Sequence, residues 1–163
     1  MFPITYIEGL NMIYYIIAFG FILIDIWTKF LAENALKAIG TVPIINDILH
    51  LTYVENRGIA FGMFSGGRIY FVVISLIILA LLSVVVLKTP KTSRTVWLKT
   101  ATAFIYGGAI GNMIERIFKG YVVDFIDFRI IDFPVFNVAD IAVCTGAAML
   151  IIHFLIAEDK KGE

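Results

Sequence analysis

Four stretches of this chain are each long and apolar enough to cross a lipid bilayer as a helix. A transmembrane helix needs about 20 mostly apolar residues, because the hydrocarbon core is about 30 Å thick. The stretches span residues 12–32, 68–87, 96–118 and 134–157. Hydrophobic residues make up 60% of the chain, more than one soluble core of this size can bury. The sequence therefore predicts a mainly α-helical integral membrane protein, with residues 1–163 forming one domain.

The charges and the rare residue types exclude several classes of function. Thirteen Lys and Arg balance thirteen Asp and Glu, so no basic surface indicates nucleic-acid binding. The single Cys144 lies in an apolar run, where we expect a small buried apolar side chain and no disulfide within the chain. His50 and His153 are far apart, and no spacing typical of a metal site occurs. We predict no metal, no cofactor and a monomer.

The positions of lysine and arginine orient the predicted spans. The loop 88–94 carries three basic residues and no acid, and the tail adds Lys160 and Lys161. By the positive-inside rule, this loop and both termini face the cytoplasm. Residues 33–67 and 119–133 then lie outside. No small-residue cleavage site follows the first span, which is therefore not a removable signal peptide.

The outer segment 41–64 is too long for a turn between two spans. Apolar and polar residues alternate through HLTYVEN and IAFGMF, with Arg57 and Gly58 between them. This alternation predicts short strands around a turn. We therefore expect a small extracytoplasmic β-sheet between helices 1 and 2, resting on the bundle.

Polar side chains in three of the spans lie at a common predicted depth. Asp25, Asn112 and Asp140 are each six or seven residues from the outer end of a span, about 10 Å below the outer surface. Charged side chains inside spans are costly and usually mark function. Helical spacing adds Arg116 to the face of Asn112 and Asn137 to the face of Asp140. The second span has only two serines in its interior and is predicted to be a wall.

Two carboxyl groups are candidates for an acid–base pair. Asp124 lies in an outer segment whose flanking valines and phenylalanine favour a return toward the bundle, so it could meet Asp140 at one water molecule. Two carboxylates held close cannot both ionise cheaply, so one keeps its proton while the other acts as a base. Asp127 and Asp132 are interpreted as solvated or salt-bridged acids, with Arg129 as a partner.

Other residues of the spans have structural interpretations. Lys29 is expected to extend its long side chain to the membrane interface. Small residues let transmembrane helices approach closely, and we expect this role for the glycines of the third span: Gly107, Gly108 and Gly111.

Five motifs, in order along four spans, make the sequence similar to the lipoprotein signal peptidase family, also called signal peptidase II or prolipoprotein signal peptidase. The motifs are DIWTK (25–29), ENRGIAFG (55–62), GGAIGNMIER (107–116), VVDFID (122–127) and FNVAD (136–140). The resemblance implies an aspartyl endopeptidase of the bacterial cytoplasmic membrane. Such an enzyme cleaves prolipoproteins just before a cysteine that bears a diacylglyceryl group. The resemblance also implies four helices with an extracytoplasmic β-cradle.

The resemblance assigns roles to individual residues. It implies that Asp124 and Asp140 are the catalytic pair. Five further residues match positions that bind substrate or support the pair: Asn56, Asn112, Arg116, Asn137 and Asp25. Three residues depart from the usual pattern, in which Gln, Asp and a small polar residue stand at the corresponding positions: Ile26, Glu115 and Ile141.

Two other classes of function remain open. A small proton-coupled transporter or channel could use the clustered acids as a relay. A relay generally needs polar groups through the whole membrane, and the inner halves of the spans offer residues such as Ser83, Thr100 and Thr102. A structural or assembly subunit is the third class, although it would not require polar groups from three helices to meet.

Overall fold

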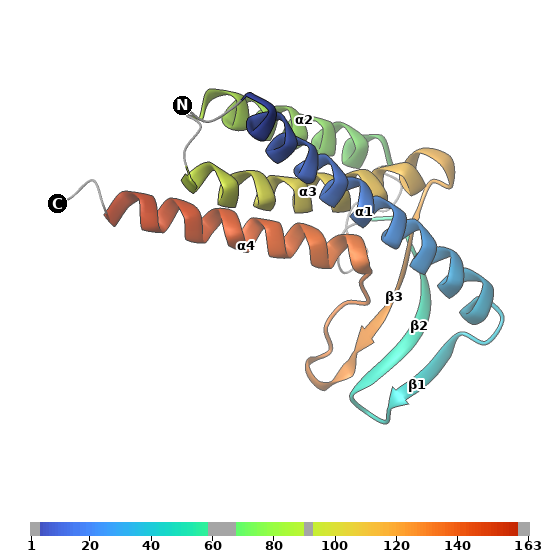
Figure 1. The fold of residues 1–163 in the computed structure, drawn as a ribbon. Coiled ribbons are helices and arrows are strands. Elements are labelled where there is room, and N and C mark those ends of the chain that lie inside the picture. The colour runs from blue at the N-terminus through green and yellow to red at the C-terminus, as the bar shows by residue number, and fades with distance from the viewer. Residues whose placement is uncertain (1–3, 59–67, 90–92, 160–163) are drawn as a thin grey trace.

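Four helices and a small sheet make up the computed structural model, which describes residues 4–58, 68–89 and 93–159 (Figure 1). The helices are α1 (Ile4–Leu36), α2 (Arg68–Lys88), α3 (Ser93–Phe118) and α4 (Val138–Asp159). The strands are β1 (Thr41–Ile45), β2 (Leu49–Asn56) and β3 (Val122–Phe128), and a short 3₁₀ helix, η2, follows at Arg129–Ile131. The sheet extends from one end of the bundle, and the start of α1 and the end of α4 lie at the other end.

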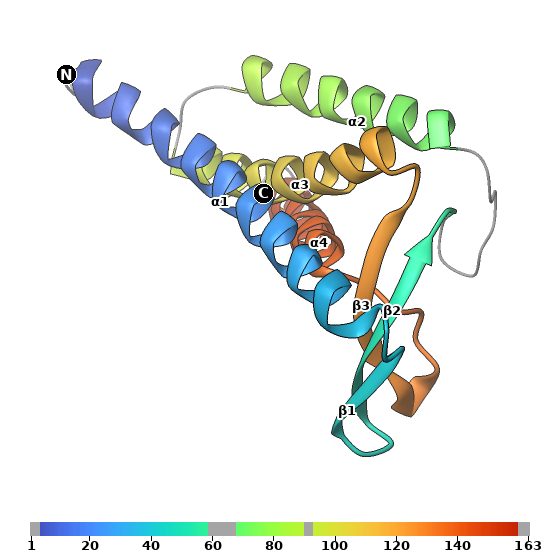
Figure 2. The same ribbon diagram turned by 90° about the vertical axis from the view of Figure 1, so that its right-hand side faces the viewer.

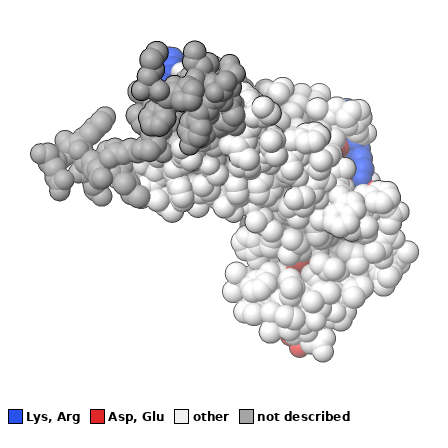
Figure 3. Space-filling view, in the orientation of Figure 1, with Lys and Arg blue, Asp and Glu red and all other residues white. Residues whose placement is uncertain are grey.

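Three of the four helices are long and apolar enough to cross a membrane: α1 over Met12–Leu36, α2 over its whole length, and α4 over Val138–Leu155. Most of the bundle face seen in Figure 3 carries no charge, as contact with lipid requires. The third predicted span, 96–118, is helical within α3 but is less apolar.

Helix α3 is less apolar because it lies against each of the other three helices (Figure 2). Its buried side chains are mostly small or polar: Thr95, Ala101, Thr102, Ala103, Asn112 and Glu115. A helix that is covered by protein does not need an apolar surface toward lipid, and small side chains let its neighbours approach. The low hydropathy of α3 therefore reflects its central place in the bundle.

Helix α4 begins at Val138, four residues later than predicted, because Asn137 caps it. The Asn137 side-chain oxygen accepts a hydrogen bond from the Asp140 backbone N–H (3.0 Å), and the Asp140 carboxylate accepts one from the Asn137 N–H (3.1 Å). This reciprocal arrangement is a capping box. Asp140 therefore lies in the first turn of α4, whereas Asp25 lies about three turns before the end of α1. Their distances from the helix ends therefore differ, but Asp25, Asn112 and Asp140 meet in one hydrogen-bonded network, as a common depth requires.

The sheet is antiparallel in the order β1-β2-β3. Strand β2 confirms the prediction for HLTYVEN, but its partner precedes it and the turn lies at 46–48, where Asp47 takes a left-handed conformation (φ 60°). The predicted second strand, 59–64, lies outside the described residues. A third strand comes from the segment between α3 and α4, so placing the sheet only between helices 1 and 2 was wrong. Strand β3 has no apolar–polar alternation at its start because Val122, Val123 and Asp124 are all buried.

Glycines of α3 let its neighbours approach, as predicted. A Cβ atom on Gly108 would lie 2.3 Å from the Ala139 carbonyl oxygen of α4. A Cβ atom on Gly111 would lie 2.5 Å from the Asp25 carboxylate of α1. Both positions therefore hold α3 close to the helices that carry the acids.

We predict that Gly108→Ala lowers the stability of the protein by about 1–3 kcal/mol, because the new methyl group overlaps the α4 backbone. Thermal unfolding in detergent would measure the change. Gly20→Ala is the matched control, since nothing lies within 4 Å of that position and alanine is the better helix former. Equal melting temperatures for the two variants would contradict the close packing.

Candidate active site

Strand β3 holds the Asp124 carboxylate inside the protein, with 2% of the residue exposed. Its two oxygens accept hydrogen bonds from two amide side chains. Asn56 of β2 donates to one oxygen at 2.8 Å, and Asn137 donates to the other at 2.6 Å. The position of Asp124 is therefore fixed from two sides.

A β-bulge brings Asn56 to the face of the sheet that carries Asp124. Leu51 pairs with Ile126 and Val54 with Asp124, so two residues of β2 oppose one residue of β3 between these pairs. Side chains alternate along a regular strand, and one extra residue shifts this alternation by one position. Val54 and Asn56 thus lie on the same face of the sheet as Asp124. In a regular strand without the bulge, Asn56 would lie on the opposite face.

Asp140 lies in the first turn of α4 and is also held by two donors. Asn112 of α3 donates its side-chain N–H to one carboxylate oxygen at 2.8 Å, and the Asn137 backbone N–H donates to the other at 3.1 Å. The N-terminal end of a helix favours a negative charge. Because Asn137 donates to Asp124 through its side chain and to Asp140 through its backbone, it holds both acids.

The buried ammonium of Lys29 orients this network, although the sequence predicted that Lys29 would reach the membrane interface. Lys29 is 1% exposed, and its Nζ lies 2.7 Å from an Asp25 carboxylate oxygen and 2.7 Å from the Asn112 side-chain oxygen. An ammonium group only donates, so it fixes which end of the Asn112 amide accepts. The N–H end of Asn112 then faces Asp140. The spacing of four residues between Asp25 and Lys29 in the sequence indicated that the two side chains share a helix face, but it did not show that both are buried.

Asp25 supports the site indirectly, through the backbone of Ala139, which precedes Asp140 in α4. Its second oxygen accepts a hydrogen bond from the Ala139 backbone N–H at 3.0 Å, which ties α1 to the first turn of α4. Asp25 itself is fully buried. It therefore fixes the helix that carries Asp140.

Glu115, one of the three departures from the family pattern, ties α3 to the strand of Asp124. Its carboxylate accepts a hydrogen bond from the Val123 backbone N–H at 2.8 Å, and the same oxygen lies 3.5 Å from Lys29 Nζ. The other two departures are exposed side chains, with 40% of Ile26 and 46% of Ile141 accessible. The sequence reasoning missed Glu115 as a member of the network.

A cavity of about 250 Å³ lies beside the network, between α2, α3 and α4. Its polar wall consists of Asp140, Asn112 and Arg116, and the Arg116 guanidinium lies 5.1 Å from the centre of the Phe71 ring on α2. The remaining lining is mostly apolar: Ser75, Ile78, Ile105, Ala109, Val143 and Cys144. Cys144 is exposed here, so the prediction that it is buried was wrong. The cavity can take an apolar segment with one polar group directed at Asp140.

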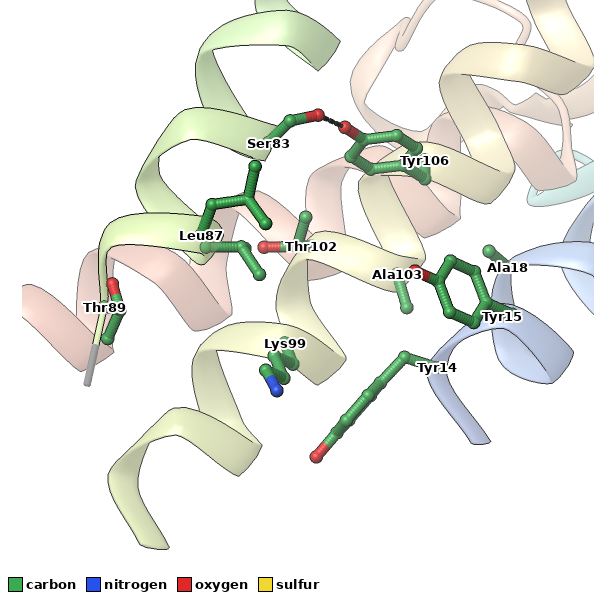
Figure 4. Close-up of a pocket in the computed structure, with 11 residues that line it drawn as sticks. Tyr14, Tyr15, Ala18, Ser83, Leu87, Thr89, Lys99, Thr102, Ala103 and Tyr106 are labelled. Atoms are coloured by element: carbon green, nitrogen blue, oxygen red, sulfur yellow. Dashed lines mark hydrogen bonds between the residues drawn. The ribbon is translucent and has the colours of Figure 1, made fainter. Parts of the chain in front are cut away.

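A larger cavity of about 560 Å³ lies between α1, α2 and α3, in the helix halves away from the sheet (Figure 4). Hydroxyl groups and one lysine supply its polar atoms, and Ser83 and Tyr106 are hydrogen-bonded to each other there. No carboxylate is among its lining residues. It therefore offers no acid–base pair for hydrolysis.

Asp127 is separated from this network, as predicted. It forms an ion pair with Arg129 (2.9 Å) and accepts a hydrogen bond from Thr52 (2.6 Å). Burial raises the pKa of Asp127, but these two partners lower it by more, so that the net pKa lies below its usual value. Asp127 is therefore an ionised structural acid. Asp132 is exposed at the end of η2.

Burial raises the pKa of Asp124 to about 6. Hydrogen bonds from Asn56 and Asn137 oppose the shift, and the nearby Asp140 charge adds to it. Asp124 therefore retains its proton in mildly acidic solution, where an ordinary aspartate has lost it.

Comparisons with known proteins agree on one family. The family model described as signal peptidase (SPase) II matches residues 17–156. A lipoprotein signal peptidase of Halothermothrix orenii is 46% identical over 149 residues, which cover 91% of this chain and 99% of the relative. The lipoprotein signal peptidase of Halalkalibacterium halodurans is 41% identical, with 93% and 97% covered. A solved structure described as a bacterial membrane enzyme has a TM-score of 0.83 and 34% identity, over 91% of this chain and 90% of the other.

We predict that Lys29→Met destabilises the protein by about 3–5 kcal/mol, because it leaves buried carboxylates without their cation. Thermal unfolding in detergent measures the effect. Lys37→Met is the matched control: Lys37 also pairs with an acid four residues earlier on α1, Glu33, but is exposed. A loss no larger than that of the control would show that the buried cation is not needed.

The stability difference between Asp124→Asn and the unsubstituted protein should depend on pH. Because the folded-state pKa of Asp124 is raised to about 6, the folded protein binds this proton more tightly than the unfolded chain. The unsubstituted protein therefore loses about 3 kcal/mol of stability from this group as pH rises from about 4 to above 6. The Asp124→Asn variant does not show this pH-dependent loss of stability, because its side chain does not titrate. Melting temperatures at pH 4–7 that differ by a constant amount would contradict the raised pKa.

Proposed function

The chain belongs to the signal peptidase II family, and we propose that it removes the signal peptide from prolipoproteins by hydrolysing the bond before their lipid-modified cysteine. The observation that supports this proposal most directly is Asn137, which donates hydrogen bonds to Asp124 and to Asp140 at once. Two carboxyl groups that share one donor residue can act on one peptide bond.

We propose that Asp140 is the base and Asp124 the acid. Two N–H donors and the N-terminal end of α4 favour the negative charge of Asp140. Burial favours the protonated form of Asp124. Asp140 takes a proton from water as the water oxygen attacks the scissile carbonyl carbon. Asp124 donates its proton to the carbonyl oxygen. Asp140, which now carries the proton taken from water, then protonates the leaving nitrogen while Asp124 takes back the hydroxyl proton, so that the C–N bond breaks, the new amine leaves and both acids return to their starting states.

The supporting residues have separate roles in the proposal. Asn112 and Asn56 hold the two carboxyl groups, and Asp25 holds the first turn of α4. Arg116, which lines the cavity beside Asp140, is the group that can bind a substrate carbonyl. The apolar lining of the same cavity suits a signal-peptide segment, and the chemistry needs neither a metal nor a cofactor.

We also propose a four-span topology in the bacterial cytoplasmic membrane, with α3 as the additional span and the whole chain as one monomeric domain. The start of α1 and the end of α4 lie at the same end of the bundle, opposite the sheet (Figure 1). The basic loop after α2 favours the cytoplasm for that end. The acids then lie toward the outer face, where the acyl chains of a lipidated cysteine are anchored.

The transporter alternative has no support from the known relatives, which are named lipoprotein signal peptidases. Proton relays need a path of polar groups across the membrane. The ionisable groups of the network gather at one end of the bundle, in the later halves of α1 and α3 and in the first turn of α4.

The test incubates purified protein in detergent with a diacylglyceryl-modified precursor and EDTA. We predict metal-independent cleavage before the modified cysteine, which Asp124→Asn and Asp140→Asn each reduce by at least about 10²–10⁴-fold, since each removes a proton-transfer group. Mass spectrometry of the products measures the cleaved bond and its rate.

Asp127→Asn is the control for these substitutions. Asp127 lies on the same strand as Asp124 but pairs with Arg129, so its loss should leave the cleavage rate close to that of the unsubstituted protein. Activity retained by Asp124→Asn or by Asp140→Asn would remove that residue from the proposed pair.

A further inference from the structure

The end of the sheet farthest from the bundle carries a patch of exposed apolar side chains. We call it the sheet tip and define it by its large apolar residues: Ile44, Ile45, Ile48, Ile130, Ile131 and Phe133. Between 36% and 66% of each residue is exposed. Outside the helices, Ile39 is the other large apolar residue with this exposure in the described part of the chain. Exposed apolar residues in this number mark a contact surface.

Two chain segments form the sheet tip together. One is the end of β1 with the turn that follows it, and the other is η2 with the residues after it. The Arg129 backbone N–H donates to the Ile48 carbonyl at 2.9 Å, and Leu49 pairs with Phe128, so the two segments are held side by side. The patch is therefore a continuous part of the sheet rather than two independent loops.

The sheet carries this patch sideways from the bundle. In Figure 1 α4 runs across the page and the tip lies below the start of α4, not beyond it. Figure 2 looks nearly along α4, and the sheet again runs away from the helices. Since α4 is long and apolar enough to cross a membrane, the tip lies beside the bundle at the level where α4 leaves the lipid.

We propose that the sheet tip inserts its apolar side chains into the outer leaflet of the membrane next to α4. Lipid is the partner because the chain runs from Phe133 of the tip directly into α4, an apolar helix that exposes 46% of Ile141 in its first turns. The tip has no free basic group to bind anionic lipid, since Arg129 pairs with Asp127 and the turns carry Asp47 and Asp132. The contact is therefore apolar and does not require anionic headgroups.

This contact gives the sheet a second attachment. The other attachment is the apolar cluster in which Ala32 and Leu36 of α1 pack with Val123 of β3. With both ends held, the sheet keeps β3 at a fixed level relative to the lipid surface. The inference concerns lipid contact and does not depend on the proposed peptidase activity.

The first experiment places an environment-sensitive fluorophore on Ile131→Cys in a Cys144→Ser background, in phosphatidylcholine vesicles that contain lipids with a nitroxide on the acyl chain. Ile39→Cys is the matched control, because 65% of Ile39 and 66% of Ile131 are exposed. Ile39 follows the end of α1, which in Figure 1 lies beyond the start of α4 along the direction in which α4 runs, whereas the tip lies below the start of α4. We expect strong quenching at position 131 and little at position 39. Two results would overturn the proposal. One is equal quenching at the two positions. The other is a fluorescence change at position 131 that depends on the amount of protein per vesicle, which would indicate contact with a second copy of the chain.

The second experiment combines Ile130→Ser, Ile131→Ser and Phe133→Ser and rests on the proposed function. Cleavage of a lipidated precursor should slow at least about fivefold in vesicles and change less than about twofold in detergent, where no bilayer surface exists. Equal losses in vesicles and detergent would overturn the membrane contact. Absence of cleavage by the unsubstituted protein would contradict the proposed function alone, because the quenching result stands independently.

Discussion

The buried positive charge of Lys29 is the interaction on which the rest of the site depends. Its ammonium group contacts Asp25 and Asn112 and lies near Glu115, so it joins α1 to α3. The same two carboxylates bind backbone N–H groups of α4 and β3, the elements that carry Asp140 and Asp124. An unpaired buried charge is costly, whereas this one is surrounded by oxygen atoms. The Lys29 ammonium thereby holds α1, α3 and α4 together and orients the Asn112 amide so that its N–H faces Asp140.

The two acids of the site differ because their backbones differ. Asp140 is a helix-capping residue whose carboxylate belongs to a hydrogen-bonded helix end, so a negative charge is favoured there. Asp124 lies on a buried strand, where water that would stabilise its charge is excluded. Asn137 contacts both and therefore holds two chemically identical side chains next to each other in different surroundings.

Much of this structure follows from local patterns in the sequence. Apolar runs identified the helices, alternation identified β2, and spacing identified the Asp127–Arg129 pair, because each involves residues close in the chain. Strand β3 was not predicted, since its first residues are buried on both faces. Lys29 was misjudged because an extended lysine is the usual outcome near a membrane surface, and its burial needs partners from a second helix.

The bulge in β2 has a consequence for how such a chain can evolve. The number of residues between Leu51 and Val54, rather than their identity, determines which side of the sheet Asn56 faces. Deletion of one residue there would turn the amide away from its acid, and no exchange of side chains at the remaining positions would turn it back. For the orientation of Asn56, the length of this segment is therefore under stronger selection than its composition.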